Sequence, residues 1–322
     1  MSELNVEKVD SGAYEKFLSE NPPDNPFSIP LFLETYREVF ACDVEYLFIL
    51  RNETPVGACA VFVGTRFSQR IVKLLPIRTY DGVCFRRLEG SKSQKQEYEK
   101  LLALQALESY LAQNFSFYQM VFPPGFSDIR SFQWAGATVI PQYTYIVDMA
   151  DYSEANYTKS LKEVLRGAER SGLGGSTCGI EELTTLQKLS YERHGRHAPV
   201  DAGRLNRLLN AFDAAGLLRT SCVRNAQGDV LAGLARMHFG KRSYFYVSGT
   251  NAEGEKGASH LLYHEILKSE NEAGISFVDF CGANTPSINL FKSSFGPRLE
   301  THFRVWRANR LVTRLASLIK RI

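Results

Sequence analysis

Lys292 lies between two aromatic residues, Phe291 and Phe295, on a short predicted helix that ends before Gly296. Aromatic neighbours exclude water, and a fixed cation in a dry site stabilises negative charge that develops on a nearby oxygen. Such charge develops in the tetrahedral intermediate of acyl transfer to an amine. The alternative is a solvated lysine on an amphipathic helix, which is the commonest environment of this residue type. We take Lys292 as the first catalytic candidate.

Asp279 follows apolar residues near the end of a predicted strand over 275–281. Open α/β sheets place ligand-binding groups at the carboxyl ends of their strands. Asp279 would therefore either deprotonate an incoming ammonium or hold the following loop by capping it. That loop reaches Asn284, which we expect to contact the substrate.

Tyr246 lies in a second predicted strand, over 243–248. A tyrosine at this place would act as a general acid towards a leaving thiolate or ribose hydroxyl. Packing in the core is the alternative interpretation. Phe295, beside Lys292, is the remaining aromatic residue that we expect to contact the substrate.

A glycine-containing loop over 250–257 follows that strand and leads into a predicted helix. Unpaired N–H groups at a helix N-terminus bind anions such as a pyrophosphate. We therefore predict a cofactor contact at Gly254, Gly257, Ala258 and Ser259. The alternative is an ordinary surface turn, and an anion site does not by itself distinguish coenzyme A from the end of a tRNA.

Basic residues recur every three or four positions in a predicted helix over 153–171, so they form one stripe on its surface. We expect three of them to contact the substrate: Lys162, Arg166 and Arg170. The stripe would meet phosphates of a nucleotide sugar, a lipid headgroup or a tRNA. Because Glu163 and Glu169 interrupt it, a solvated helix face is the alternative.

The elements that position these candidates repeat along the chain. Each half contains a β-hairpin, a helix, a strand, a short helix and a closing strand. In the first half the hairpin, helix and strand are expected at 45–51, 56–64, 97–112 and 115–122. In the second half they are expected at 220–224, 230–239, 258–272 and 275–281.

This self-similarity predicts a duplicated domain, and hairpins followed by helix–strand alternation predict an α/β fold with mixed (α+β) sheets. We place the boundary near residue 150, with domains over 1–150 and 151–308. One sheet spanning both halves is the alternative. Gln133 occupies the place of Lys292 in the first copy and supplies no charge. The second copy is therefore expected to be catalytic and the first non-catalytic.

Four stretches of the chain, in order and spacing, resemble the FemAB-like branch of the GNAT acyltransferase superfamily. They are Asp128–Phe132 with Tyr143–Asp148, Lys162–Leu173, Tyr246–Leu262 and Asp279–Gly296. The resemblance implies two tandem GNAT-like domains and a role for Lys292. It implies acyl-CoA or aminoacyl-tRNA as the donor, a primary amine on a small or lipid-linked molecule as the acceptor, and a place in cell-envelope or polysaccharide assembly. A tRNA is then a partner.

Two features depart from the pattern of the peptidoglycan enzymes. No heptad-like run long enough for a coiled-coil insertion occurs. The segment 27–40 has Arg37 as its only basic residue, where those enzymes use lysine for a nucleotide-sugar diphosphate. A peptidoglycan precursor is therefore not favoured as the acceptor. The alternative function is a catalytically inactive module of the same fold that binds a nucleotide-sugar or lipid-linked ligand.

Composition agrees with a globular protein. The 322 residues carry a net charge of +3, too little to indicate nucleic-acid binding by charge alone. The start has no signal-peptide pattern, and the six cysteines are scattered as in a reducing compartment. A cytoplasmic protein is expected. Histidine pairs such as His260 and His264 lack a third ligand, so no metal is expected.

The segment 309–322 has apolar residues on one helical face and basic residues elsewhere. We predict a basic amphipathic helix. It would lie on the anionic inner surface of the membrane, giving a peripheral location, or pack on its own domain. No Gly-x-Ser-x-Gly elbow, Walker loop or dinucleotide fingerprint occurs in the sequence, which disfavours those enzyme classes.

Overall fold

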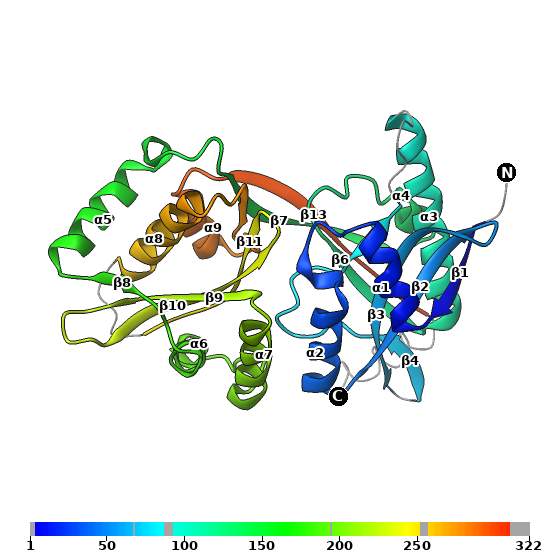
Figure 1. The fold of residues 1–322 in the computed structure, drawn as a ribbon, viewed down its shortest axis with the longest axis horizontal. Coiled ribbons are helices and arrows are strands. Elements are labelled where there is room, and N and C mark those ends of the chain that lie inside the picture. Colours follow the sequence, from blue (N-terminus) through cyan, green and yellow to red (C-terminus); the bar gives the residue numbers. More distant parts are fainter. Residues whose placement is uncertain (1–3, 67, 87–92, 194, 252–256, 310–322) are drawn as a thin grey trace, which may run out of the picture. The chain divides into compact units, whose positions relative to one another are not determined.

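The computed structural model describes residues 4–66, 68–86, 93–193, 195–251 and 257–309. The chain divides into two compact units (Figure 1). Unit 1 runs to Gln142 and resumes at His302, and unit 2 runs from Tyr143 to Thr301. The predicted boundary near residue 150 stays a prediction. The predicted C-terminal helix lies almost wholly outside the described residues, which end at 309.

Unit 1 contains a mixed sheet in the order β1-β2-β3-β4-β6-β13, with β5 paired to β3. All its ladders are antiparallel except that between β4 and β6. Its elements are β1 (Leu4–Val9), α1 (Ser11–Glu20), the 3₁₀ turn η1 (Pro26–Ser28), α2 (Pro30–Phe40), β2 (Asp43–Arg51), β3 (Thr54–Arg66), β4 (Gln69–Val72), β5 (Val83–Phe85), α3 (Ser93–Asn114), β6 (Phe117–Phe122) and α4 (Arg130–Trp134).

Helices cover both faces of this sheet. Leu104, Leu107 and Leu111 recur at helical spacing on α3 and pack with Leu47 and Val61 of the sheet. On the opposite face the contacts are aromatic: the rings of Tyr14 of α1 and Tyr46 of β2 lie 4.9 Å apart. A second such contact joins Tyr36 of α2 and Phe62 of β3, at 5.8 Å. The core of unit 1 therefore has two layers, one on each face of the sheet.

Two strands belong to both units: β7 (Thr138–Asp148) and β13 (Arg298–Ala308). The remaining elements of unit 2 are η2 (Glu154–Asn156), α5 (Lys159–Arg170), β8 (Gly174–Ser176), α6 (Ile180–Arg193), α7 (Ala202–Ala214), β9 (Leu218–Arg224), β10 (Val230–Phe239), β11 (Arg242–Thr250), α8 (Ala258–Glu272), β12 (Phe277–Asp279) and α9 (Pro286–Ser293). Its sheet has the order β7-β12-β11-β10-β9-β8, and the β11–β12 ladder is its parallel pair.

Helices α8 and α5 lie on one face of the unit 2 sheet, and α6 and α7 lie on the other (Figure 1). Leu161 and Leu165 of α5 share a buried cluster with Leu261 of α8 and Phe245 of β11. On the other face, α6 approaches β11 so closely that a Cβ on Gly249 would lie 2.3 Å from the backbone nitrogen of Gln187. The expected mixed α/β fold is confirmed.

Each crossover helix carries a buried carboxylate. Glu108 of α3 accepts hydrogen bonds from Tyr118, at 2.9 Å, and from Arg307, at 2.6 Å. Glu270 of α8 pairs with Arg236 and accepts from His238, at 2.9 Å. Because buried charges are stable only when they are paired, these clusters fix α3 and α8 to strands of their own units.

Candidate functional site

Strands β11 and β12 separate at their carboxyl ends. Their parallel ladder runs from Arg242 opposite Phe277 to Tyr244 opposite Asp279, whereas β11 continues to Thr250. β12 also pairs with β7 along its other edge, and beyond Asp279 this pairing continues, because the N–H of Phe280 donates to the carbonyl of Tyr145 at 2.9 Å. A ligand site in an open α/β sheet is expected at such a carboxyl edge.

Tyr246 occupies a β-bulge. Ala235 of β10 is opposite Val247 and Arg236 is opposite Phe245, so Tyr246 is the extra residue of the bulge. Its half-buried ring lies 6.1 Å from Phe212 of α7. Bulges re-aim side chains next to functional sites. The structure thus singles out the backbone at Tyr246, and its role as a general acid stays a prediction.

The carboxylate of Asp279 holds the loop after β12. It accepts hydrogen bonds from the hydroxyl of Thr144, at 2.6 Å, and from the N–H of Cys281, at 2.7 Å. The hydroxyl of Thr144 in turn accepts from the N–H of Gly282 at 3.0 Å. Both Cys281, at φ 53, and Gly282, at φ 103, adopt the left-handed conformation. These bonds show the capping role proposed for Asp279 and leave the proton-transfer role a prediction.

Lys292 of α9 is buried against the same loop. Its ammonium donates to the carbonyl of Phe280 at 2.5 Å and to that of Gly282 at 2.8 Å. Burial lowers the pKa of Lys292, and the nearby Cys281 and Asp279 oppose this effect. The side chain is 7% exposed, so the solvated alternative does not describe it. The ammonium therefore lies at the loop, beside the separated strands.

An aromatic cluster packs against this loop and includes Phe295. The Phe295 ring lies 5.5 Å from Tyr157, 5.6 Å from Tyr263 and 6.1 Å from Phe280. Asn284 is exposed, but a hydrogen bond fixes its position, because its Oδ1 accepts the N–H of Tyr143 at 2.9 Å. Both residues thus flank the Lys292 loop, and their contact with substrate stays a prediction.

The predicted cofactor contact lies at the start of α8. Gly257 is the N-cap of this helix at φ 107, and no side chain among the residues that the structure describes caps it. A Cβ on Gly257 would lie 3.1 Å from Val164 of α5, so this turn is backed closely by another helix. Ala258 and Ser259 form the first turn, whose N–H groups have no acceptor within the helix. Gly254 lies outside the described residues.

The basic stripe is exposed along α5. Lys162 donates to the carbonyl of Ala155 at 3.1 Å, and Arg166 and Arg170 each donate to the carbonyl four residues earlier. The opposite face of α5 is buried through Leu161, Leu165 and Ala168. Among the described residues, none of these three cations forms an ion pair. The stripe is therefore accessible to an anionic ligand.

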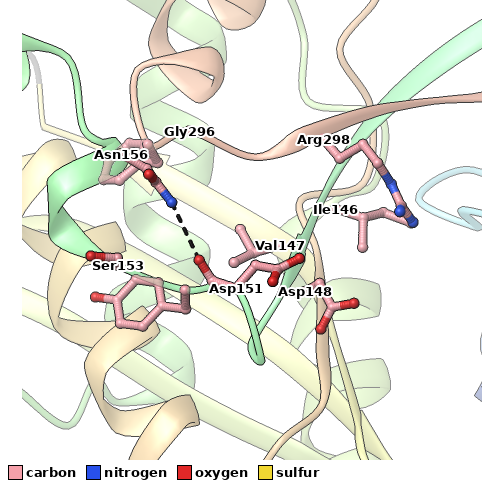
Figure 2. Close-up of a pocket in the computed structure, with 10 residues that line it drawn as sticks. Ile146, Val147, Asp148, Asp151, Ser153, Asn156, Gly296 and Arg298 are labelled. Carbon is pink, nitrogen blue, oxygen red and sulfur yellow. Dashed lines mark hydrogen bonds between the residues drawn. The ribbon is translucent and has the colours of Figure 1, made fainter.

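A small cavity of about 110 Å³ lies at the start of β12. Figure 2 shows Asp148, Asp151, Ser153 and Asn156 around it, with Gly296 at one side. Asn156 donates to the carbonyl of Asp151 at 3.3 Å. Asp148 pairs with Phe277, at the opposite end of β12 from Asp279. Of the predicted site residues, Phe295 lines this cavity, and Lys292, Asp279 and Tyr246 do not.

Sequence reasoning missed Thr144, the fully buried side chain that joins Asp279 to Gly282. A lone threonine in a strand carries no signal of its own, and its partner lies 135 residues away in the chain. The bulge at Tyr246 was also missed, since bulges leave no regular sequence pattern.

Residues 156–292 match the family model described as an acetyltransferase (GNAT) domain. This part of the chain, somewhat less than half of it, is similar to a GNAT acetyltransferase domain. It spans α5 to α9 and contains the separated strands, the bulge and Lys292. The match therefore classifies the protein as an acyltransferase. No curated protein sequence matches the chain.

Three solved structures share the fold over nearly their whole length. FemX is 14% identical, with a TM-score of 0.63, over 93% of this chain and 96% of that one. L-PGS from Bacillus licheniformis is 14% identical, with a TM-score of 0.57, over 98% and 97%. A tandem GNAT protein from the clavulanic acid biosynthesis pathway is 10% identical, with a TM-score of 0.55, over 94% and 98%. The chain thus has the fold of tandem GNAT proteins, as expected.

No helix among the described residues has the length and apolar character needed to cross a membrane.

Proposed function

We propose that the protein transfers an acyl or aminoacyl group from acyl-CoA or aminoacyl-tRNA to a primary amine. The reaction centre would lie in unit 2, at the carboxyl ends of β11 and β12. The observation that carries this proposal is the buried ammonium of Lys292, held by two carbonyls of the loop that follows Asp279. Unit 1 would be non-catalytic.

In this proposal the amine attacks the carbonyl carbon of the donor, and a C–N bond forms while the carbonyl oxygen gains negative charge. Lys292 would stabilise that charge, since a cation in a dry site interacts strongly with a developing anion. The C–S or C–O bond then breaks, and the departing thiolate or ribose oxygen takes the proton lost by the amine. Tyr246 would deliver that proton. Asp279 would position the loop and accept the proton of the incoming ammonium.

The donor would be held by its phosphates. The uncapped N-terminus of α8 at Gly257 suits the pyrophosphate of acyl-CoA. The stripe of Lys162, Arg166 and Arg170 suits the longer phosphate backbone of a tRNA. Both features belong to the GNAT domain. The acceptor would be a small or lipid-linked amine used in envelope or polysaccharide assembly, with Asn284 and Phe295 lining its site.

Binding measurements with acetyl-CoA and with an aminoacylated RNA hairpin would separate the two donors. The test variant replaces Lys162, Arg166 and Arg170 by Gln. The matched control replaces Lys188, Arg204 and Arg207 of α6 and α7, which are also exposed, so that both variants lose the same charge.

If aminoacyl-tRNA is the donor, the test variant binds RNA with a slope of log K against log salt that is shallower by about 2, and the control does not. If acyl-CoA is the donor, acetyl-CoA binds all three proteins equally well. Release of the thiol or of uncharged RNA in the presence of an amine panel then reports transfer. Failure of both donors to bind would reject the proposal.

The runner-up function is a catalytically inactive module that binds a nucleotide-sugar or lipid-linked ligand. The exposed stripe on α5 is the observation that favours it, since it would serve a phosphate ligand without any chemistry. Binding of a nucleotide diphosphate-sugar, without binding of either donor, would choose this function over transfer.

A further inference from the structure

Arg78 is a buried cation on the face of the unit 1 sheet that α1 and α2 cover. Its side chain is 1% exposed, and its NH1 pairs with Asp81 at 2.7 Å. The other oxygen of Asp81 accepts the N–H of Val121 at 2.6 Å. The ring of Phe62 lies beneath the guanidinium, 4.6 Å from its centre. Asp81 thus satisfies one nitrogen of Arg78.

Within the described part of the chain, the remaining edge of the guanidinium has no hydrogen-bond partner. Nε and NH2 of Arg78 are both buried there without a hydrogen bond. More than nine in ten buried polar groups in proteins are hydrogen-bonded, because each unpaired one destabilises the fold. Arginine does not escape this cost by losing its proton. These N–H groups are therefore donors that lack an acceptor.

The position of Arg78 in the fold also indicates a ligand. It lies in the connection from β4 to α3, which leaves the carboxyl end of the strand that pairs in parallel with β6. The matching connection in unit 2 runs from β11 to α8 and contains the proposed donor site. Crossovers of this kind border ligand crevices in open sheets.

The backbone beside Arg78 is strained. Ile77 adopts φ 55, in the left-handed region that a β-branched residue rarely occupies. Such strain persists where the surrounding structure imposes it, and it gathers at ligand-binding sites. Gly82, four residues on, packs so tightly on Ser28 that a Cβ there would meet the serine hydroxyl at 1.4 Å. The connection is therefore held in one conformation, with Arg78 fixed in it.

We propose that unit 1 binds the oxyanion of a small ligand, a carboxylate or a phosphate, through the Nε and NH2 edge of Arg78. Two parallel N–H groups match the two oxygens of such a group, which makes the contact bidentate. Asp81 holds the opposite edge and fixes the orientation of the fork. This site is independent of the reaction proposed for unit 2.

The test is a titration of the full chain with inorganic phosphate and, separately, with acetate, at ionic strength held constant with chloride. The side-chain Nε–H signal of Arg78 in ¹⁵N-labelled protein reports binding directly. Arg78→Lys keeps the charge that pairs with Asp81 but removes the fork. Arg130→Lys is the matched control, because Arg130 also pairs with an aspartate, at 2.7 Å, and lies over a tryptophan, yet is 60% exposed.

We expect saturable binding that shifts the Arg78 signal, with affinity at least about tenfold lower in Arg78→Lys and unchanged in Arg130→Lys. Tighter binding of phosphate than of acetate assigns a phosphorylated ligand, and the reverse assigns a carboxylate. The double variant Arg78→Met/Asp81→Asn removes both charges together, so it tests the site without leaving a buried charge unpaired. Absence of saturable binding of either anion, or equal affinity in Arg78→Lys, would overturn the proposal.

Discussion

Units 1 and 2 each contain a short helix that leads into a long closing strand, but the two helices carry different residues at the matching position. In unit 1, Gln133 of α4 is exposed. In unit 2, Lys292 of α9 is buried and donates to two carbonyls. The copies thus share their backbone plan while one of them fixes a cation at the end of its parallel strands. Chemistry is expected where that cation is.

The connections from β4 to α3 in unit 1 and from β11 to α8 in unit 2 also carry different residues. In unit 2 the connection ends at Gly257, the N-cap residue of α8. In unit 1 the corresponding connection contains the buried Arg78. One copy offers backbone N–H groups and the other a guanidinium, and both are donors suited to anions. The two units therefore carry different hydrogen-bond donors on corresponding connections, and we propose an anion for each.

The largest effect is expected from Lys292→Met compared with Gln133→Met. Loss of the cation should lower kcat by about 100- to 1,000-fold, as removal of one oxyanion-stabilising group does. Gln133→Met should leave kcat unchanged. Steady-state rates with whichever donor the binding measurements identify would measure both. Because Lys292 also holds the loop, the melting curve and the KM must be measured, and a defect confined to KM would contradict a role in the chemical step.

Glu270→Gln and Glu108→Gln compare the buried carboxylates of α8 and α3. Glu270→Gln leaves Arg236, whose side chain is 10% exposed, without its partner, so unit 2 should lose about 3 kcal/mol of stability. Glu108→Gln removes the charge that pairs with Arg307, whose side chain is 39% exposed. It should cost unit 1 about 1–2 kcal/mol of stability. Both tryptophans, Trp134 and Trp306, lie in unit 1, so their fluorescence reports that unit alone. Circular dichroism reports both units.

The Glu270→Gln variant also tests how the stability of unit 2 depends on pH. Burial opposes ionisation of Glu270, but the hydrogen bond from His238 and the charge of Arg236 hold its pKa below the usual value. The folded state therefore binds this proton less readily than the unfolded state. Stability from Glu270 is present above pH 4.5, the ordinary pKa, and is lost as the pH falls through the lower folded value. Glu270→Gln should remove that loss, and an unchanged acid profile would contradict it.

A buried histidine of unit 1, His302, is compared with a half-buried histidine of unit 2, His260. Burial lowers the pKa of His302 from 6.5 to about 4, and it lowers that of His260 as well. The unfolded chain protonates first, so stability falls as the pH drops from 6.5 towards 4. For His302 the loss should reach about 2–3 kcal/mol. Urea unfolding of wild type and His302→Gln at pH 7 and 4.5, followed by tryptophan fluorescence, tests this. An equal loss of unfolding free energy between the two pH values in both proteins would refute it.

The smallest effect is expected from Gly257→Ala compared with Gly274→Ala, at the two ends of α8. Both glycines have positive φ, 107 and 71, so each alanine should cost about 1 kcal/mol of stability. A Cβ at Gly257 meets Val164 at 3.1 Å, whereas one at Gly274 meets nothing within 4 Å. Donor affinity should fall several-fold in Gly257→Ala only. Equal donor affinity in both variants would remove the N-terminus of α8 from the donor site.

Repetition in the sequence predicted much of unit 2 because its helices carry regular apolar spacing. The helix expected over 258–272 is α8. The helix expected over 153–171 begins later, at Lys159, because the side chain of Thr158 caps it by accepting the N–H of Leu161. Local patterns of this kind depend on neighbours within a few residues, which a single sequence displays.

The candidate site depends on contacts that are distant in the chain. The bond between Thr144 and Asp279 and the carbonyl partners of Lys292 come from tertiary packing. Arg78 had no sequence signal either, since an arginine in a loop is usually solvated. The residue types at the site could therefore be chosen from the sequence, and their hydrogen-bond partners could not.

Because β13 joins the sheet of unit 1 through its ladder with β6, unit 1 is built from two segments that unit 2 separates in the chain. During synthesis on a ribosome, the sheet of unit 1 begins first but stays without β13 until the residues of unit 2 have emerged. Unit 2, made from one continuous segment, is available for folding earlier. Lys292, the catalytic candidate, thus lies in the unit that can fold first. The edge of β6 that pairs with β13 is the last to be covered.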